Sequence, residues 1–174
     1  MPRETVTLFF ALLACATVAA VAALGVALLV GERGRPIVDA FHSVALEVAA
    51  AVAVTATLGS LYLSEVADFV PCRLCWIQRG FMYPAAALLV AAVVLRRRLL
   101  AAVAGLLALG GLPVALFHRW EQSYGTVGGF CSPTTPCTTR WVDHFGFITI
   151  PTMAAAGFLG VASLVALHLF RRTP

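Results

Sequence analysis

The sequence predicts an all-α integral membrane protein, and three observations support this: its composition, its charge distribution and its long apolar runs. Hydrophobic residues make up 61% of the 174-residue chain, charged residues only 11%, and the mean hydropathy is +0.94. A soluble domain carries roughly 45–50% apolar and about 25% charged residues, so the composition excludes a soluble globular protein and a disordered chain. The net charge of +4 comes from 12 arginines and 8 acids placed between the apolar blocks. We interpret these charges as topology signals and expect no nucleic acid as a partner.

Five apolar segments are long enough to cross a membrane, because about 20 mainly apolar residues span the roughly 30 Å of hydrocarbon. The spans are predicted at about 6–30, 44–64, 75–95, 99–117 and 147–170. The first contains no charged residue between Glu4 and Glu32. Pro84, Pro113 and Pro151 fall inside or at the edges of spans, where kinks or helix starts accommodate them.

The first segment is expected to be a true span rather than a signal peptide. Its apolar run is much longer than the usual 7–15 residues of a signal-peptide core. Cleavage stays open as the alternative, and it would leave the sidedness of every later loop unchanged.

The arginines predict which loops face the cytoplasm. In a five-span chain, the Arg96–Arg98 turn, the 31–43 loop and the C-terminal Arg171 and Arg172 share one side. That side carries seven arginines against five on the other, so the positive-inside rule makes it cytoplasmic. The N-terminus and both cysteine-bearing loops are then expected outside.

Four of the five cysteines form two close pairs, Cys72 with Cys75 and Cys131 with Cys137, both on the predicted outer side. Cys15 lies among alanines in the first span, where we expect a small buried apolar residue. The pairs fit a zinc site of four thiolates, two structural disulfides or two redox-active dithiols. The second pair is spaced more widely than a usual zinc knuckle, and a CxxC ring is small for a purely structural bond. Redox-active dithiols are therefore the favoured interpretation.

The setting of the first pair favours redox chemistry. Pro71 lacks an N–H and suits a helix start, so Cys72 and Cys75 are predicted to occupy the first turn of the third span. The positive end of the helix dipole favours a thiolate there. Arg79 follows Cys75 by four residues on the same helix face and is expected to stabilise its thiolate or hydrogen-bond an anionic ligand oxygen. Gln78 is a polar neighbour for which the sequence by itself indicates no separate function.

Several of these motifs resemble one bacterial family. The stretch SEVADFVPCRLCWIQRGFMYP at 64–84, the second cysteine pair, and FGFITIP at 145–151 are similar to bacterial disulfide bond formation protein B, closest to its short BdbC-type branch. The resemblance covers about residues 50–170.

The resemblance implies a four-helix transmembrane bundle, here with one extra N-terminal transmembrane helix. It also implies a bound quinone (ubiquinone or menaquinone) and a thioredoxin-like, DsbA-like partner outside the cytoplasm of a bacterial cell. On this basis we expect residues 1–43 to form the extra helix and a cytoplasmic loop. Residues 44–174 would form a four-helix redox bundle in the inner membrane with two extracytoplasmic cysteine loops.

The resemblance further implies a role for each candidate residue. Cys72 and Cys75 would be the quinone-coupled pair, with Cys75 touching the quinone and Arg79 holding its oxygen. The second cysteine pair would be the shuttle pair, with Cys131 receiving the partner's thiol. His118, at the outer end of the fourth span, lies near where the family places further quinone contacts.

Two other functions compete with this interpretation. A vitamin K epoxide reductase-like protein is a related enzyme, but that family usually carries its CxxC after the loop pair, and here the CxxC comes first. A non-catalytic membrane scaffold with two structural disulfides is the alternative from another class.

Overall fold

The computed structural model describes residues 3–125, 131 and 134–170, so the predicted C-terminal basic pair at 171–172 lies outside the described residues. The elements are α1 (Arg3–Leu29), the 3₁₀ turn η1 (Gly31–Gly34), α2 (Arg35–Ser43), α3 (Ala45–Glu65), α4 (Arg73–Leu95), α5 (Arg98–Tyr124) and α6 (Ile150–Phe170). Five of these helices are long and apolar enough to cross a membrane. They match the predicted spans within three residues at every end but one, because α5 continues to Tyr124.

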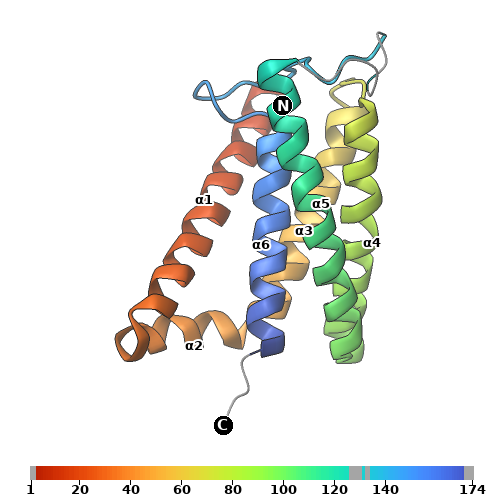
Figure 1. Ribbon diagram of the computed structural model, residues 1–174. Helices are drawn as coiled ribbons and strands as arrows, with labels where there is room; N and C mark the ends of the chain where they lie inside the picture. Colours follow the sequence, from red (N-terminus) through yellow and green to blue (C-terminus); the bar gives the residue numbers. More distant parts are fainter. Residues whose placement is uncertain (1–2, 126–130, 132–133, 171–174) are drawn as a thin grey trace.

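Four helices form a bundle, and α1 lies against its side (Figure 1). Within the bundle α5 packs against α4 and α6, while α3 packs against the same two helices. The helix α1 packs mainly on α6, slants away from it toward the lower end, and is joined back to the bundle by α2 (Figure 1). Across the described residues the only β pairing is one bridge between His144 and Ile148. The predicted four-helix bundle with an extra N-terminal helix is confirmed.

Small residues let the bundle helices approach closely. Fully buried alanines face the interior from α3 and α5: Ala45, Ala49, Ala53, Ala101, Ala104, Ala108 and Ala115. At Gly111 on α5, an added Cβ would lie 2.3 Å from the ring of Phe158 on α6, so only glycine fits there. Such contacts matter in a membrane, where lipid is as apolar as the side chains and close packing drives helix association.

The prediction of a loop at 31–43 was wrong, since a 3₁₀ turn and α2 fill this segment. Pro36 lies in the first turn of α2, where a missing N–H removes no helical hydrogen bond. Val38 is buried against the bundle core and gives the short helix an anchored apolar side. Isolated helices of this length are marginal, so tertiary packing and not local propensity forms α2.

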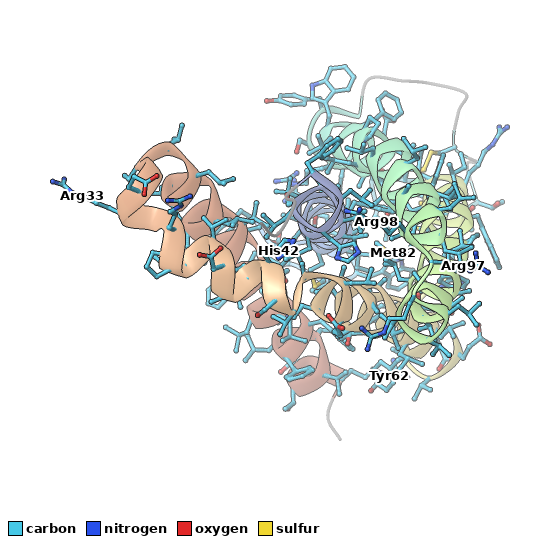
Figure 2. All side chains as sticks on the ribbon, turned by 90° about the horizontal axis from the view of Figure 1, so that it is seen from below. Arg33, His42, Tyr62, Met82, Arg97 and Arg98 are labelled. Atoms are coloured by element: carbon cyan, nitrogen blue, oxygen red, sulfur yellow. A yellow bond between two sulfur atoms is a disulfide. The ribbon has the colours of Figure 1, made fainter. Side chains whose placement is uncertain are left out.

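The two ends of the bundle differ in what they carry. The α3–α4 connection and the segment before α6, which hold the two cysteine pairs, lie at the upper end together with the N-terminus (Figure 1). Arg33, Arg97 and Arg98 appear at the opposite end, seen from below in Figure 2. The predicted grouping of the loops, with both cysteine pairs at one end and the arginine turn at the other, is therefore confirmed.

Cys15 is exposed on α1, so the prediction that it is buried was wrong. The reason is that the middle of α1 is poorly covered by the bundle: the buried residues of this helix, Thr7, Ala11, Leu24 and Ala27, all lie in its first and last thirds. Cys15 lies in the stretch between them.

Candidate active site

The first cysteine pair caps α4 at the upper end of the bundle. Cys72 follows Pro71 and has extended backbone angles, φ −75° and ψ 174°, and its Sγ accepts a hydrogen bond from the Cys75 N–H at 3.4 Å. The two Sγ atoms are 3.1 Å apart. Cys72 is thus the N-cap and Cys75 lies in the first turn, which confirms the predicted place of the pair.

A buried histidine contacts Cys72, and a buried glutamine contacts that histidine. His118 on α5 and Gln78 on α4 are only 3% and 6% exposed. The side-chain nitrogen of Gln78 is 2.9 Å from His118 Nδ1, and His118 Nε2 is 3.6 Å from Cys72 Sγ. An amide nitrogen can only donate, so Nδ1 accepts and the neutral ring keeps its proton on Nε2, directed at the sulfur.

These contacts stabilise negative charge on Cys72, which lies just outside the helical span. The Cys75 thiol donates to Cys72 Sγ, and His118 donates as well. Together they hold the pKa of the Cys72 thiol well below its ordinary value, although burial acts in the opposite direction. Thiolate, not thiol, is the nucleophile and the better leaving group in disulfide exchange.

Arg79 is buried one turn below Cys75 and is held by α3. Its Nε donates to Ser60 Oγ at 3.0 Å, and its Nη2 donates to the Ser60 carbonyl at 2.9 Å. The guanidinium also lies 5.0 Å from the Trp76 ring centre and 6.0 Å from that of Tyr83. A cation fixed in this way is preorganised to meet a negative or partly negative oxygen.

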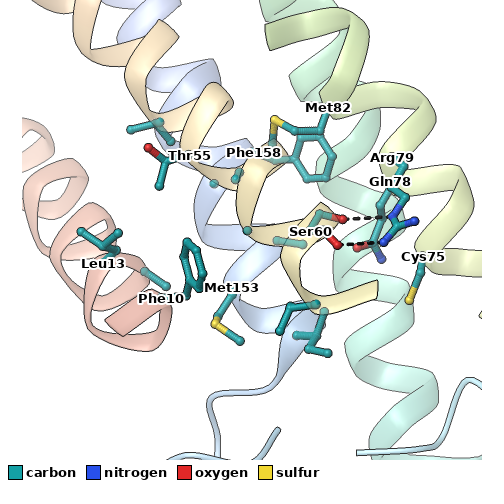
Figure 3. Close-up of a pocket in the computed structure, with 18 of the residues that line it drawn as sticks. Phe10, Leu13, Thr55, Ser60, Cys75, Gln78, Arg79, Met82, Met153 and Phe158 are labelled. Carbon is teal, nitrogen blue, oxygen red and sulfur yellow. Dashed lines mark hydrogen bonds between the residues drawn. The ribbon is translucent and has the colours of Figure 1, made fainter. Parts of the chain in front are cut away.

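Cys75 and Arg79 line a cavity of about 360 Å³ between α1, α3, α4 and α6. Figure 3 shows Cys75, Gln78, Arg79 and Ser60 gathered on one side of it, with Thr55 and mostly apolar side chains around the rest of its wall. Its size falls in the range of about 300–1,000 Å³ that small-molecule sites occupy, and a few polar groups at one end of an apolar wall are typical of them.

The second cysteine pair forms a disulfide, Cys131–Cys137, with the two Cα atoms 5.8 Å apart. Cys137 is 2% exposed and belongs to the same buried cluster as Cys72 and Leu74, with Cys131 at the edge of that cluster. The fold therefore brings together two pairs that are far apart in the sequence. Because the second pair is a disulfide, the alternative of a zinc site made of all four thiolates is wrong.

A smaller cavity of about 280 Å³ lies between the two pairs, lined by Cys72, Cys75, His118, Gln122 and Cys137 among others. Gln122 is 7% exposed and donates to the Thr139 carbonyl at 3.1 Å, which ties α5 to the segment after the disulfide. Cys75 lines this cavity and the larger one. Cys75 is thus the one cysteine of the described residues that borders both the cavity beside the second cysteine pair and the larger cavity.

The predicted quinone contact of His118 stays a prediction. Among the described residues His118 lines the smaller cavity and not the larger one. Sγ of Cys72, Sγ of Cys75 and a ring nitrogen of His118 lie within 4.8 Å of one another, a set of atoms of the kind that bind a soft metal ion. In a CxxC site the same closeness also lets the two sulfurs form a disulfide and lets the histidine hydrogen-bond to a thiolate.

The sequence did not predict that Ser60 belongs to the site, and it indicated no separate function for Gln78. Gln78 carried a weak signal, since a polar side chain one turn into a span needs a buried partner. Ser60 carried none, because serine is common in membrane helices and only the packing of α3 against α4 brings it to Arg79.

Comparison with known proteins assigns the chain to a family. The family model "Disulfide bond formation protein DsbB" matches residues 42–168. A probable disulfide formation protein of Oceanobacillus iheyensis is 42% identical over 118 residues, covering 66% of this chain and 79% of the relative. The disulfide bond formation protein C of Bacillus subtilis is 36% identical over 110 residues, covering 62% of this chain and 80% of the relative. No solved structure matches significantly.

The match includes α3 to α6 almost to its last residue, and it includes every cysteine of the two pairs. It decides among the functions that the sequence left open, since neither a vitamin K epoxide reductase-like protein nor a non-catalytic scaffold is what the family model and the relatives describe. The chain belongs to the DsbB family, and it is a multi-pass membrane oxidoreductase that forms disulfide bonds.

Proposed function

We propose that this oxidoreductase withdraws an electron pair from an extracytoplasmic thioredoxin-like dithiol protein and passes it to a membrane quinone, ubiquinone or menaquinone. The observation that carries the proposal is the position of Cys75, which lines both the cavity facing the second cysteine pair and the larger apolar chamber. A relay between a water-side thiol and a lipid-side acceptor needs a sulfur at such a junction.

The first step takes place at the Cys131–Cys137 disulfide. A thiolate of the partner attacks Cys131, which is the less buried of the two, and Cys137 leaves as a thiolate. The partner's second thiol then displaces Cys131, so the partner leaves oxidised and the second pair is left as a dithiol. Two electrons and two protons have passed to this chain.

The second step moves the electrons to the first pair, which must then be in its disulfide form. Cys137 lies in the same cluster as Cys72 and attacks its sulfur, so Cys75 leaves as a thiolate. Cys131 next attacks Cys137 and displaces Cys72, which re-forms the Cys131–Cys137 disulfide. His118 Nε2 donates its hydrogen bond to the departing Cys72 sulfur, and Gln78 holds the ring in the required tautomer. We therefore assign His118 to the proton at Cys72 in place of the expected quinone contact.

The residues of the larger cavity fit the ring of a quinone. Arg79 offers a buried guanidinium, fixed by Ser60, at the polar end of a cavity whose other lining residues are mostly apolar. We expect Arg79 to bind a ring oxygen and Cys75 to lie beside the ring. When bound, a quinone supplies the acceptor for two electrons and two protons. The rings of Trp76 and Tyr83 lie beside the guanidinium and help to hold it in place.

We place the two cysteine pairs outside the cytoplasm, in the cell membrane of a bacterium. The support is the charge pattern: the described loops of the opposite end carry Arg33, Arg35 and the Arg96–Arg98 turn. Short basic loops are retained on the cytoplasmic side. An oxidising compartment at the cysteine end also suits a pair that rests as a disulfide.

Thiol trapping tests the proposal. The purified chain, carrying Cys15→Ala so that only the four paired cysteines react, is mixed with a reduced thioredoxin-like partner with and without quinone. We expect the four thiols to accumulate without quinone and to return to disulfides when quinone is added. Cysteines that stay oxidised throughout would contradict the relay. Thiols that accumulate but do not reoxidise with either quinone would contradict the acceptor alone.

A further inference from the structure

The helix α1 lies outside the residues that the family model matches, which begin at 42, yet it supplies one wall of the larger cavity. Its contribution is a single helix face, with residues at spacings of three and four: Phe10, Leu13, Ala14 and Thr17. Figure 3 shows Phe10 and Leu13 projecting from α1 on the side of the cavity opposite Arg79, Gln78 and Cys75. The extra helix is therefore part of the chamber.

Close contacts place this face accurately. An added Cβ at Gly59 on α3 would lie 2.8 Å from the Phe10 ring, and one at Gly160 on α6 would lie 2.5 Å from the Thr17 methyl group. Gly160 lets Thr17 pack directly on the backbone of α6, and Gly59 makes room for the Phe10 ring on α3. At the upper end, a hydrogen bond of 3.0 Å between Thr7 Oγ1 and His144 Nε2 adds a polar tie.

The α1 wall is apolar where the opposite wall is polar. Thr17 donates its hydroxyl to the Leu13 carbonyl at 2.8 Å, so it turns its methyl group toward Gly160. Phe10, Leu13 and Ala14 have no polar side-chain atom. Leu13 lines the cavity and is also 37% exposed at the surface of α1. A ligand filling this space meets charge at one end and hydrocarbon at the other.

We propose that α1 completes the electron-acceptor site by holding the apolar tail of the quinone against Phe10, Leu13 and Ala14, while Arg79 and Cys75 receive the ring. This inference rests on the proposed function and adds to it the part of the chain that selects the ligand. A site built this way prefers a quinone with a long hydrocarbon chain over the same ring without one. The extra helix is then a determinant of specificity, although no group on it takes part in the chemistry.

The test compares binding of two probes that share a fully substituted benzoquinone ring, one carrying a decyl chain and the other a methyl group. Binding is read from quenching of tryptophan fluorescence in the oxidised full-length chain, since Trp141 lines the cavity and Trp76 contacts Arg79. The variant Ala14→Phe places a large side chain in the part of the cavity next to α1. Its matched control is Ala16→Phe, on the exposed side of α1 and away from the cavity.

Wild type should bind the decyl probe more tightly than the methyl probe. Ala14→Phe should weaken the decyl probe at least about tenfold, the low end of what one methylene changes in an apolar pocket, and leave the methyl probe within about twofold. Ala16→Phe should leave both unchanged. Phe10→Ala, which removes tail contact without adding bulk, should also weaken only the decyl probe, and it decides the matter if Ala14→Phe fails to fold.

Decyl-probe affinities equal to wild type in the folded variants would overturn the inference. Equal loss for both probes would overturn it as well, because the ring and not the tail would then lie on α1. If wild type binds neither probe, and does not bind a naphthoquinone that carries the same decyl chain, the proposed quinone acceptor itself fails. A different result separates the two proposals: if wild type binds both probes equally and neither substitution changes this, the role of α1 is refuted. The quinone acceptor would then still stand.

Discussion

Replacing Arg79 tests the centre of the proposed acceptor site. The side chain is 9% exposed, and two hydrogen bonds to Ser60 fix it one turn below Cys75. Arg79→Ala removes the permanent cation in the polar part of the larger cavity. We therefore expect the apparent KM for quinone to rise, while the reaction of the partner at the second cysteine pair, which does not line this cavity, stays nearly unchanged.

The magnitude follows from the bonds that are lost. One hydrogen bond to a charged group contributes roughly 1.5–3 kcal/mol, and each 1.4 kcal/mol changes an equilibrium constant about tenfold. Loss of one such bond to a quinone oxygen corresponds to roughly a 10- to 150-fold higher KM. Arg79→Lys keeps the charge but loses the planar fork that reaches Ser60, so it should recover only part of this loss. Ser60→Ala keeps the guanidinium but loosens it, and should give a smaller rise of several-fold.

The assay is steady-state kinetics with quinone varied at saturating reduced partner. Arg119→Ala is the matched control, because Arg119 lies at the same end of the bundle, donates to Ser123 on its own helix and lines neither cavity. A thermal melt of each variant separates loss of binding from loss of folding. An unchanged quinone KM and kcat in folded Arg79→Ala would show that Arg79 is only a structural anchor, and the reasoning from its geometry would be refuted.

Three further predictions address the relay. Cys131→Ser should abolish oxidation of the protein partner and spare quinone reduction by a small dithiol that reaches Cys72 directly; survival of both activities, measured side by side, would make the second pair structural. His118→Ala should raise the pKa of Cys72, so alkylation of the reduced pair should become fast only at a higher pH. Gln78→Leu should shift this pH in the same direction by a smaller amount. A pH profile of His118→Ala identical to that of wild type would remove His118 from the mechanism. A membrane-impermeant maleimide should label Cys131 and Cys137 in reduced intact cells, whereas labelling only after lysis would reverse the assigned sidedness.

The membrane helices could be predicted from the sequence because their cause is local. Hydrocarbon cannot hydrogen-bond to backbone N–H and C=O groups. A run of about 20 apolar residues that crosses the bilayer must therefore form a helix, whatever the rest of the chain does. The position of Cys72 and Cys75 was equally local, since Pro71 and the following apolar run fix the start of α4. The place of α2 was not, because a helix of nine residues forms only when Val38 is buried against the bundle.

The sequence by itself determined the class of protein, the number of spans, the two cysteine pairs and the position of Arg79 one turn after Cys75. Only the tertiary structure decided what those residues touch. Ser60 reaches Arg79 across 19 positions, and His118 reaches Gln78 and Cys72 across 40 and 46. Such contacts depend on the depth and rotation at which separate helices pack, and these follow from interlocking small and large side chains along whole interfaces. The same packing makes the first helix, which the sequence showed only as an extra span, a wall of the cavity, because Gly59 and Gly160 leave room for its side chains.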